Sequence, residues 1–286
     1  MTRPPLLALL AASAAAPALA QDDALTIWVG ANRDLAAIEE VAAAFTADLG
    51  IPVTVEEVDP DLPQKFQQAA ATGDGPDIVM WAHDRFGEWA SGGLIQPVSP
   101  SAEWTDGILP SAMDAVTFDG RVWGYPVSVE AVHLIYNTDL VSEPPASFEE
   151  VMALEVPEGV APIPAVNGEP APPFLGVIAM AVNAASPNPD LAAELIENYL
   201  LTDEGLAAWN AGGALGALAD VSAAEAQDDP RVDGMLAVAA DAVPMPSNAE
   251  MGAFWAAMAP ALTNITSQAQ EPQEALDDAA RRILGE

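Results

Sequence analysis

The stretch 69–87 reads AAATGDGPDIVMWAHDRFG and decides the fold of this chain. A turn signal at 73–76 precedes the short apolar run 78–80, which predicts a buried strand. One aromatic and three polar or charged side chains follow the run directly: Trp81, His83, Asp84 and Arg85. A strand that ends in such groups is typical of an open α/β sheet, which binds ligands at the carboxyl ends of its strands.

The residues before this stretch alternate between strand and helix patterns. LTIWVG at 25–30 and IPVTVE at 51–56 predict two buried strands, and 77–81 is the third. Residues 34–49 carry apolar side chains at helical spacing and end before a glycine suited to a C-cap, and 60–71 predicts a second helix. This strand–helix alternation predicts a parallel sheet covered by helices.

The later part of the chain predicts further elements around a proline-rich segment. Strands are expected at 121–126, 131–137 and 176–185, and residues 156–173 hold six prolines, which is typical of an extended linker. SFEEVMAL at 147–154 predicts a helix that opens with a capping box. Five more helices are expected at 188–201, 202–211, 231–243, 250–265 and 272–284.

The first twenty residues predict a secretory signal peptide. Arg3 gives the positive start, 6–16 the apolar core, and 18–20 (ALA) the small-residue cleavage site before Gln21. No run after it reaches the roughly 18 apolar residues of a membrane span, so we expect a mature protein that is not membrane-embedded. The chain has no cysteine, which excludes disulfides, thiolate metal sites and a cysteine nucleophile.

The amino-acid composition of the chain limits which partners the protein can bind. With 43 acidic and 8 basic side chains the formal net charge is −35, so nucleic acid is not an expected partner and anionic membrane surfaces would repel the protein. The sequence contains no HExxH motif, phosphate-binding loop or EF-hand loop, so we expect no metal and no cofactor. We expect a monomer whose acidic groups mainly solvate its surface.

Several stretches in order resemble the maltose/maltodextrin-binding proteins of bacterial ABC importers. Besides 69–87 these are YPVSVE (125–130), LIYN (134–137), NAASPN (183–188), NYLLTDEGL (198–206) and GAFW (252–255). The resemblance implies an α/β periplasmic-binding-protein type II fold with two lobes of parallel-type sheets flanked by helices. The first lobe would be 25–129 plus 176–221, and a reduced second lobe would be 130–174 plus 222–286.

The chain departs from that family in its second lobe. Between Leu154 and Val160 it lacks on the order of a hundred residues that family members carry, far more than an ordinary loop deletion. The family's Tyr and Arg after the C-terminal Trp are Ala256 and Ala259 here, and one acidic contact of the first lobe is Pro63. We therefore expect a truncated second lobe and an incomplete cleft.

The resemblance implies a set of sugar-contacting residues, which also fit the chemistry of a sugar. An indole covers the apolar face of a pyranose, and charged groups bond its hydroxyls. Asn32 and Arg33 match loosely, because relatives usually have an Asp-Lys pair there, and His83 is expected to be structural. The implied ligand-binding residues are Asn32, Arg33, Trp81, Asp84, Arg85, Glu130 and Trp255.

The sequence thus predicts an extracytoplasmic, periplasmic solute-binding protein. It would capture maltose or maltodextrin without catalysing a reaction and present it to an inner-membrane ABC importer permease. One alternative is a degenerate, truncated copy that no longer binds sugar tightly. The other is a glycan hydrolase that uses Asp84 and Glu130 as its acid pair, which would require an unusual pKa at one of them.

Overall fold

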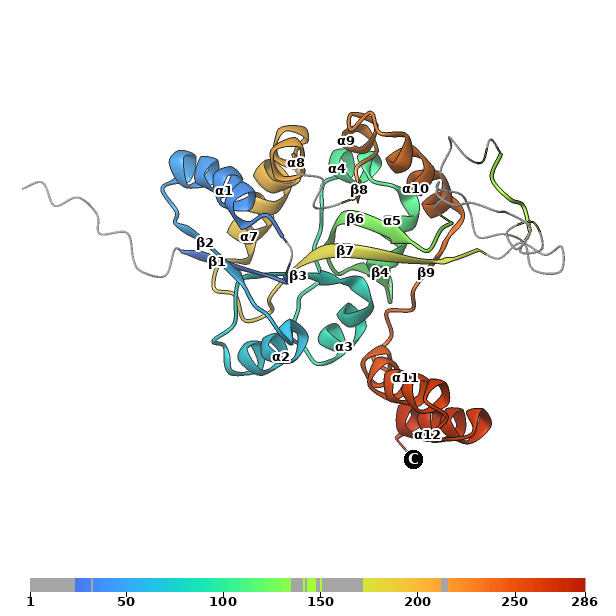
Figure 1. Cartoon of the computed structure of the whole chain (residues 1–286). Coiled ribbons are helices and arrows are strands. Elements are labelled where there is room, and N and C mark those ends of the chain that lie inside the picture. The colour runs from blue at the N-terminus through green and yellow to red at the C-terminus, as the bar shows by residue number, and fades with distance from the viewer. Residues whose placement is uncertain are drawn as a thin grey trace, which may run out of the picture.

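A computed structural model of the chain describes residues 24–31, 33–134, 141, 143–147, 150, 172–211 and 216–285. Its main feature is a seven-stranded mixed sheet with helices on both faces (Figure 1). Six strands lie in the order β2-β1-β3-β7-β6-β8, and β9 pairs with β7. These strands are β1 (Leu25–Val29), β2 (Val53–Glu57), β3 (Ile78–Ala82), β6 (Tyr125–Ala131), β7 (Phe174–Val182), β8 (Ala217–Leu218) and β9 (Val243–Pro244).

The remaining elements surround this sheet. A two-stranded ribbon is formed by β4 (Thr117–Phe118) and β5 (Arg121–Val122). A 3-10 turn, η1, spans His83–Arg85, and a π-helical turn, η2, spans Ile196–Leu200. The α-helices are α1 (Leu35–Leu49), α2 (Leu62–Thr72), α3 (Phe86–Ser91), α4 (Ala102–Gly107), α5 (Pro110–Ala115), α7 (Pro189–Leu195), α8 (Asp203–Trp209), α9 (Val221–Glu225), α10 (Pro230–Asp241), α11 (Met251–Thr266) and α12 (Pro272–Leu284).

The first half of the sheet is the parallel α/β unit that the sequence predicts. β1 pairs in parallel with both β2 and β3. At the start of α1 the Asp34 carboxylate accepts a hydrogen bond from Ala37 N at 3.1 Å, and Gly50 ends the helix in the left-handed conformation at φ 73°. Helices α1 and α8 lie on one side of the sheet and α2 and α3 on the other (Figure 1).

The second half of the sheet is mainly antiparallel and centres on β7, with which the short β9 pairs in parallel. Strand β7 lies between β3 and β6, antiparallel to both, and its residues 177–182 are buried. The expected strand at 131–137 is wrong over its first residues, because β6 begins earlier and ends at Ala131 opposite Leu175. Pro172 and Pro173 precede β7 and have no N–H to donate, so the ladder stops there. Residues 135–140 lie outside the described part of the chain.

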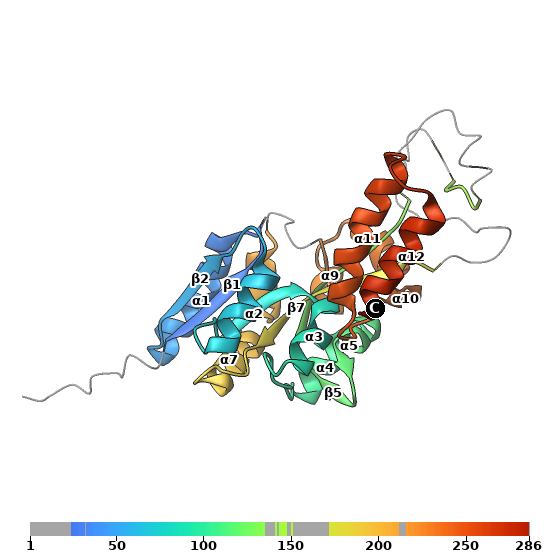
Figure 2. The same ribbon diagram turned by 90° about the horizontal axis from the view of Figure 1, so that it is seen from below.

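Most of the described chain shares one core. Ala223, Val232 and Ala239, from α9 and α10, are buried with the sheet residues, whereas α11 and α12 pack on each other through a small separate cluster of alanines. Figures 1 and 2 show this α11–α12 pair set apart from the sheet. The division into two lobes remains a prediction, and the described part of the proposed second lobe includes segments that pack with the larger core.

The predicted helix at 147–154 falls mostly outside the described residues. Half of the predicted capping box is present, since Glu150 N donates to Ser147 Oγ at 3.2 Å. The Glu150 carboxylate accepts instead from Ala146 N, one residue before the cap, at 2.7 Å. Over the described ranges, no helix combines the length and apolarity that crossing a bilayer requires.

Candidate functional site

Three strand ends meet at one edge of the sheet. β1 and β3 are parallel, and β6 runs in the same direction as β3 because each is antiparallel to β7. The carboxyl ends of the three strands therefore lie at the same edge, where Arg33 follows β1, Asp84 follows β3 and Glu130 is near the end of β6. Asn32 lies outside the described residues. This edge is where open α/β sheets place ligands.

Trp81 lies half-buried at this edge, over the end of the neighbouring strand. Gly30 directly follows β1, and a Cβ added to it would lie 2.6 Å from the Trp81 ring atom Cζ3. A larger residue at 30 would thus push the indole away, so the glycine allows the ring to lie close against β1. An indole held in this way can stack on the apolar face of a sugar ring.

Arg33 and Glu130 contribute opposite charges to the same region. Partial burial lowers the pKa of the Arg33 guanidinium, and the nearby Glu130 carboxylate opposes that shift. Arg33 makes no ion pair within 4.0 Å with any described residue, and Glu130 is exposed. Within the described part of the chain no ion pair engages these two side chains, and such guanidinium N–H groups and carboxylate oxygens can bond hydroxyl groups.

Asp84 and Arg85 are both held by other parts of the protein. Asp84 is only 5% exposed, and its Oδ2 accepts a hydrogen bond from the indole Nε1 of Trp255 at 2.6 Å. Arg85 Nη1 lies 3.4 Å from Glu88 Oε2, one turn further along the chain. The structure thus brings Trp255, from the C-terminal α11, to the motif after β3.

His83 is a structural residue in this arrangement. The ring is fully buried; its Nδ1 accepts from Val177 N at 3.0 Å, and its Nε2 donates to Met245 O at 3.0 Å. Burial lowers the pKa of His83, so the neutral imidazole is favoured. The side chain links β7 to the segment that leads into α11.

The residues that position α11 at this edge could not be predicted from local sequence patterns. A Cβ on Gly87 would lie 1.5 Å from Ser247 O, and one on Gly252 would lie 2.5 Å from Glu88 Oε2. These contacts join positions about 160 residues apart, which only the folded chain reveals. Among the residues that the structure describes, no group of three or more His, Asp or Glu side chains could hold a metal ion.

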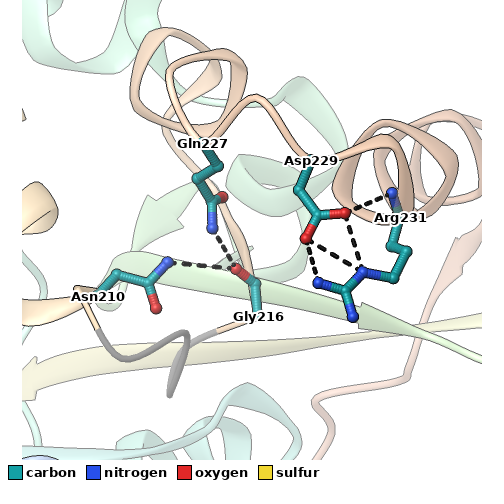
Figure 3. Close-up of polar contacts among 5 residues, drawn as sticks. All are labelled: Asn210, Gly216, Gln227, Asp229 and Arg231. Atoms are coloured by element: carbon teal, nitrogen blue, oxygen red, sulfur yellow. Dashed lines mark hydrogen bonds and ion pairs between the residues drawn. The ribbon is translucent and has the colours of Figure 1, made fainter.

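A cavity of about 420 Å³ lies elsewhere, between α8, β8 and α9. Beside it the carbonyl of Gly216 accepts from Gln227 Nε2 at 3.1 Å and from Asn210 Nδ2 at 3.5 Å (Figure 3). At its rim the Arg231 guanidinium holds the pKa of Asp229 at about 2. None of the described residues that line this cavity is among the predicted sugar contacts.

Comparison with known proteins finds relatives over part of the chain. Residues 40–161 match the model of a family described as bacterial extracellular solute-binding protein. The chain is 34% identical over 132 residues to a maltotriose-binding protein of Pyrococcus abyssi, covering 44% of this chain and 29% of that protein. It is 30% identical over 123 residues to a maltodextrin-binding protein of Bacillus subtilis, covering 41% and 28%.

A maltooligosaccharide ABC transporter solute-binding lipoprotein of Streptococcus pneumoniae is 33% identical over 116 residues, covering 40% of this chain and 27% of the lipoprotein. The chain therefore spans less than a third of the length of these curated relatives. All three names describe solute-binding proteins rather than enzymes. Residues 40–161 of the chain are thus similar to bacterial extracellular solute-binding proteins.

Proposed function

We propose that this protein binds a maltodextrin-type oligosaccharide outside the cytoplasm for an ABC importer. The observation that carries the proposal is the half-buried indole of Trp81, held over Gly30 at the strand edge that also carries Arg33 and Glu130. The indole would stack on a sugar ring, and the charged groups would bond its hydroxyls. The names of the Pyrococcus and Streptococcus relatives support a sugar ligand and a transporter partner.

The proposal also extends to location. A signal peptide at 1–20 would deliver the mature chain to the periplasm, where the loaded protein would dock to the permease as a monomer. The similarity of residues 40–161 to bacterial extracellular solute-binding proteins supports this route.

Isothermal titration calorimetry with maltotriose tests the proposal. We expect saturable binding that Arg33→Gln weakens by about tenfold or more, because a hydrogen bond to a charged group contributes roughly 1.5–3 kcal/mol. The matched control is Arg121→Gln, since Arg121 is exposed on β5 outside the proposed site. A wild-type protein that binds no maltodextrin, or equal losses in both variants, would contradict the proposal.

A second candidate is a degenerate copy that no longer binds sugar tightly. The observation in its favour is that Asp84 and Arg85 are already engaged by Trp255 and Glu88. Titration decides between the two, because an intact site gives an affinity in the micromolar range or better. Product analysis of the same mixtures tests the glycan hydrolase, for which the residues at this edge offer the least support.

A further inference from the structure

The contact between Asp84 and Trp255 ties the C-terminal hairpin, α11–α12, to the sugar motif. A carboxylate that is 5% exposed needs a hydrogen-bond donor, because a buried charge without one is costly. Trp255 supplies that donor at 2.6 Å, a short distance for an N–H donor to a carboxylate. It is the one side-chain hydrogen bond to the Asp84 carboxylate among the described residues.

Three further contacts hold the hairpin in the same place. Met245 O accepts from the buried ring of His83, and the backbone at Ser247 crosses directly over Gly87. Gly252, at the start of α11, passes close to Glu88 and Arg85, whose side-chain ends would have to move if a Cβ were added there. The position of Trp255 therefore follows from a series of backbone contacts, and its indole N–H reaches Asp84 as a consequence.

The side chain of Trp255 is partly exposed to solvent. The residue is 41% exposed, and its ring meets Phe254 edge-on with centroids 5.0 Å apart. The indole N–H is thus directed into the protein while part of the ring faces solvent. An Asp84 carboxylate oriented in advance loses less conformational freedom when a ligand hydroxyl binds to it.

We propose that Trp255 is a positioning residue, whose indole N–H orients the Asp84 carboxylate for the ligand and locks α11 to the strand edge. The inference rests on the proposed function and assigns Trp255 a role besides the sugar contact that the family resemblance implies. Asp84 Oδ2 is occupied by the indole, so ligand hydroxyls would bond chiefly to Oδ1.

The first test needs no sugar. Indole N–H resonances of the full chain are recorded by ¹H–¹⁵N NMR and assigned with Trp255→Phe. We expect Asp84→Asn to move the Trp255 resonance upfield, because an amide oxygen is a weaker acceptor than a carboxylate. The Trp104 resonance serves as the control, since its buried Nε1 has no hydrogen-bond partner among the described residues. An unmoved Trp255 resonance would overturn the contact.

The second test measures maltotriose binding by calorimetry. Trp255→Phe keeps an aromatic ring but removes the N–H, and we expect a loss of about tenfold or more. The matched control, Trp104→Phe, removes an unbonded N–H and should leave the affinity unchanged. If the wild type binds but Trp255→Phe binds equally well, the positioning role is wrong and the proposed function stands. If the wild type does not bind, the proposed function fails and the positioning role falls with it.

Discussion

Gly87→Ala is expected to destabilise the protein because the Ser247 backbone occupies the space of the new methyl group. The added Cβ would lie 1.5 Å from Ser247 O and 2.5 Å from its carbonyl carbon. Non-bonded heavy atoms prefer about 3.5 Å, so the crossing segment must retreat by roughly 2 Å. Such a shift would also break the 3.0 Å hydrogen bond between His83 and Met245 O.

The size of the effect follows from these two losses. Overpacking costs about 1–3 kcal/mol and the lost hydrogen bond about 1 kcal/mol, against a gain of roughly 0.4–1 kcal/mol from replacing a glycine. The free energy of unfolding should therefore fall by about 1–3.6 kcal/mol. For a chain of this size that corresponds to a melting temperature lower by about 2–14 °C.

The assay is thermal and denaturant unfolding of the variant beside Gly176→Ala. A Cβ on Gly176, in β7, meets its nearest atom at 3.6 Å, an ordinary contact, so this control should be neutral or slightly stabilising. Gly87 lies inside helix α3, where alanine is intrinsically the better residue by about 1 kcal/mol. A Gly87→Ala protein as stable as the wild type, or more stable, would refute the docking of Ser247 on α3.

Three further predictions concern pH, packing and export. Burial lowers the pKa of His83 below its ordinary 6.5, so the unfolded chain takes up a proton that the folded chain does not. The free energy of unfolding should therefore not depend on His83 protonation above about pH 6.5 and should fall as the pH drops below that value. In urea melts of His83→Gln this decrease of the unfolding free energy at low pH should be lost. Trp209→Ala should lower the free energy of unfolding by about 3–5 kcal/mol, because the ring is fully buried, while calorimetry shows unchanged sugar affinity per folded molecule. N-terminal sequencing of periplasmic protein should begin at Gln21, and a chain that retains Met1 would argue against the signal peptide.

Local patterns were sufficient for the parallel part of the fold. The alternation of short apolar runs with 3.6-residue periodicity predicted β1 to β3, and Asp34 and Gly50 mark the two ends of α1 as helix-capping chemistry requires. The strand expected at 131–137 was wrong over its first residues because apolar alternation gives no information about the partner strand. Pairing ends where Pro173 cannot donate, and that limit belongs to β7 rather than to β6.

The sequence could predict the part of the candidate site that follows β3, but not the contribution of α11. Trp81 and Asp84 adjoin a strand in the sequence, so topology alone places them at the carboxyl edge of the sheet. The bond from Trp255 to Asp84 joins residues 171 positions apart and depends on where the backbone at Ser247 crosses α3. No local property of GAFW predicts that its indole donates to a carboxylate.

β6 and β7 are adjacent and antiparallel, and this arrangement determines where residues can be inserted into the chain or deleted from it. Two such strands can be joined by a turn of a few residues, so everything between Ala131 and Phe174 is an insertion within a hairpin. The free-energy cost of closing such a loop rises only with the logarithm of its length. Evolution can therefore lengthen or shorten the insert widely while β6 and β7 keep the same register in the middle of the sheet.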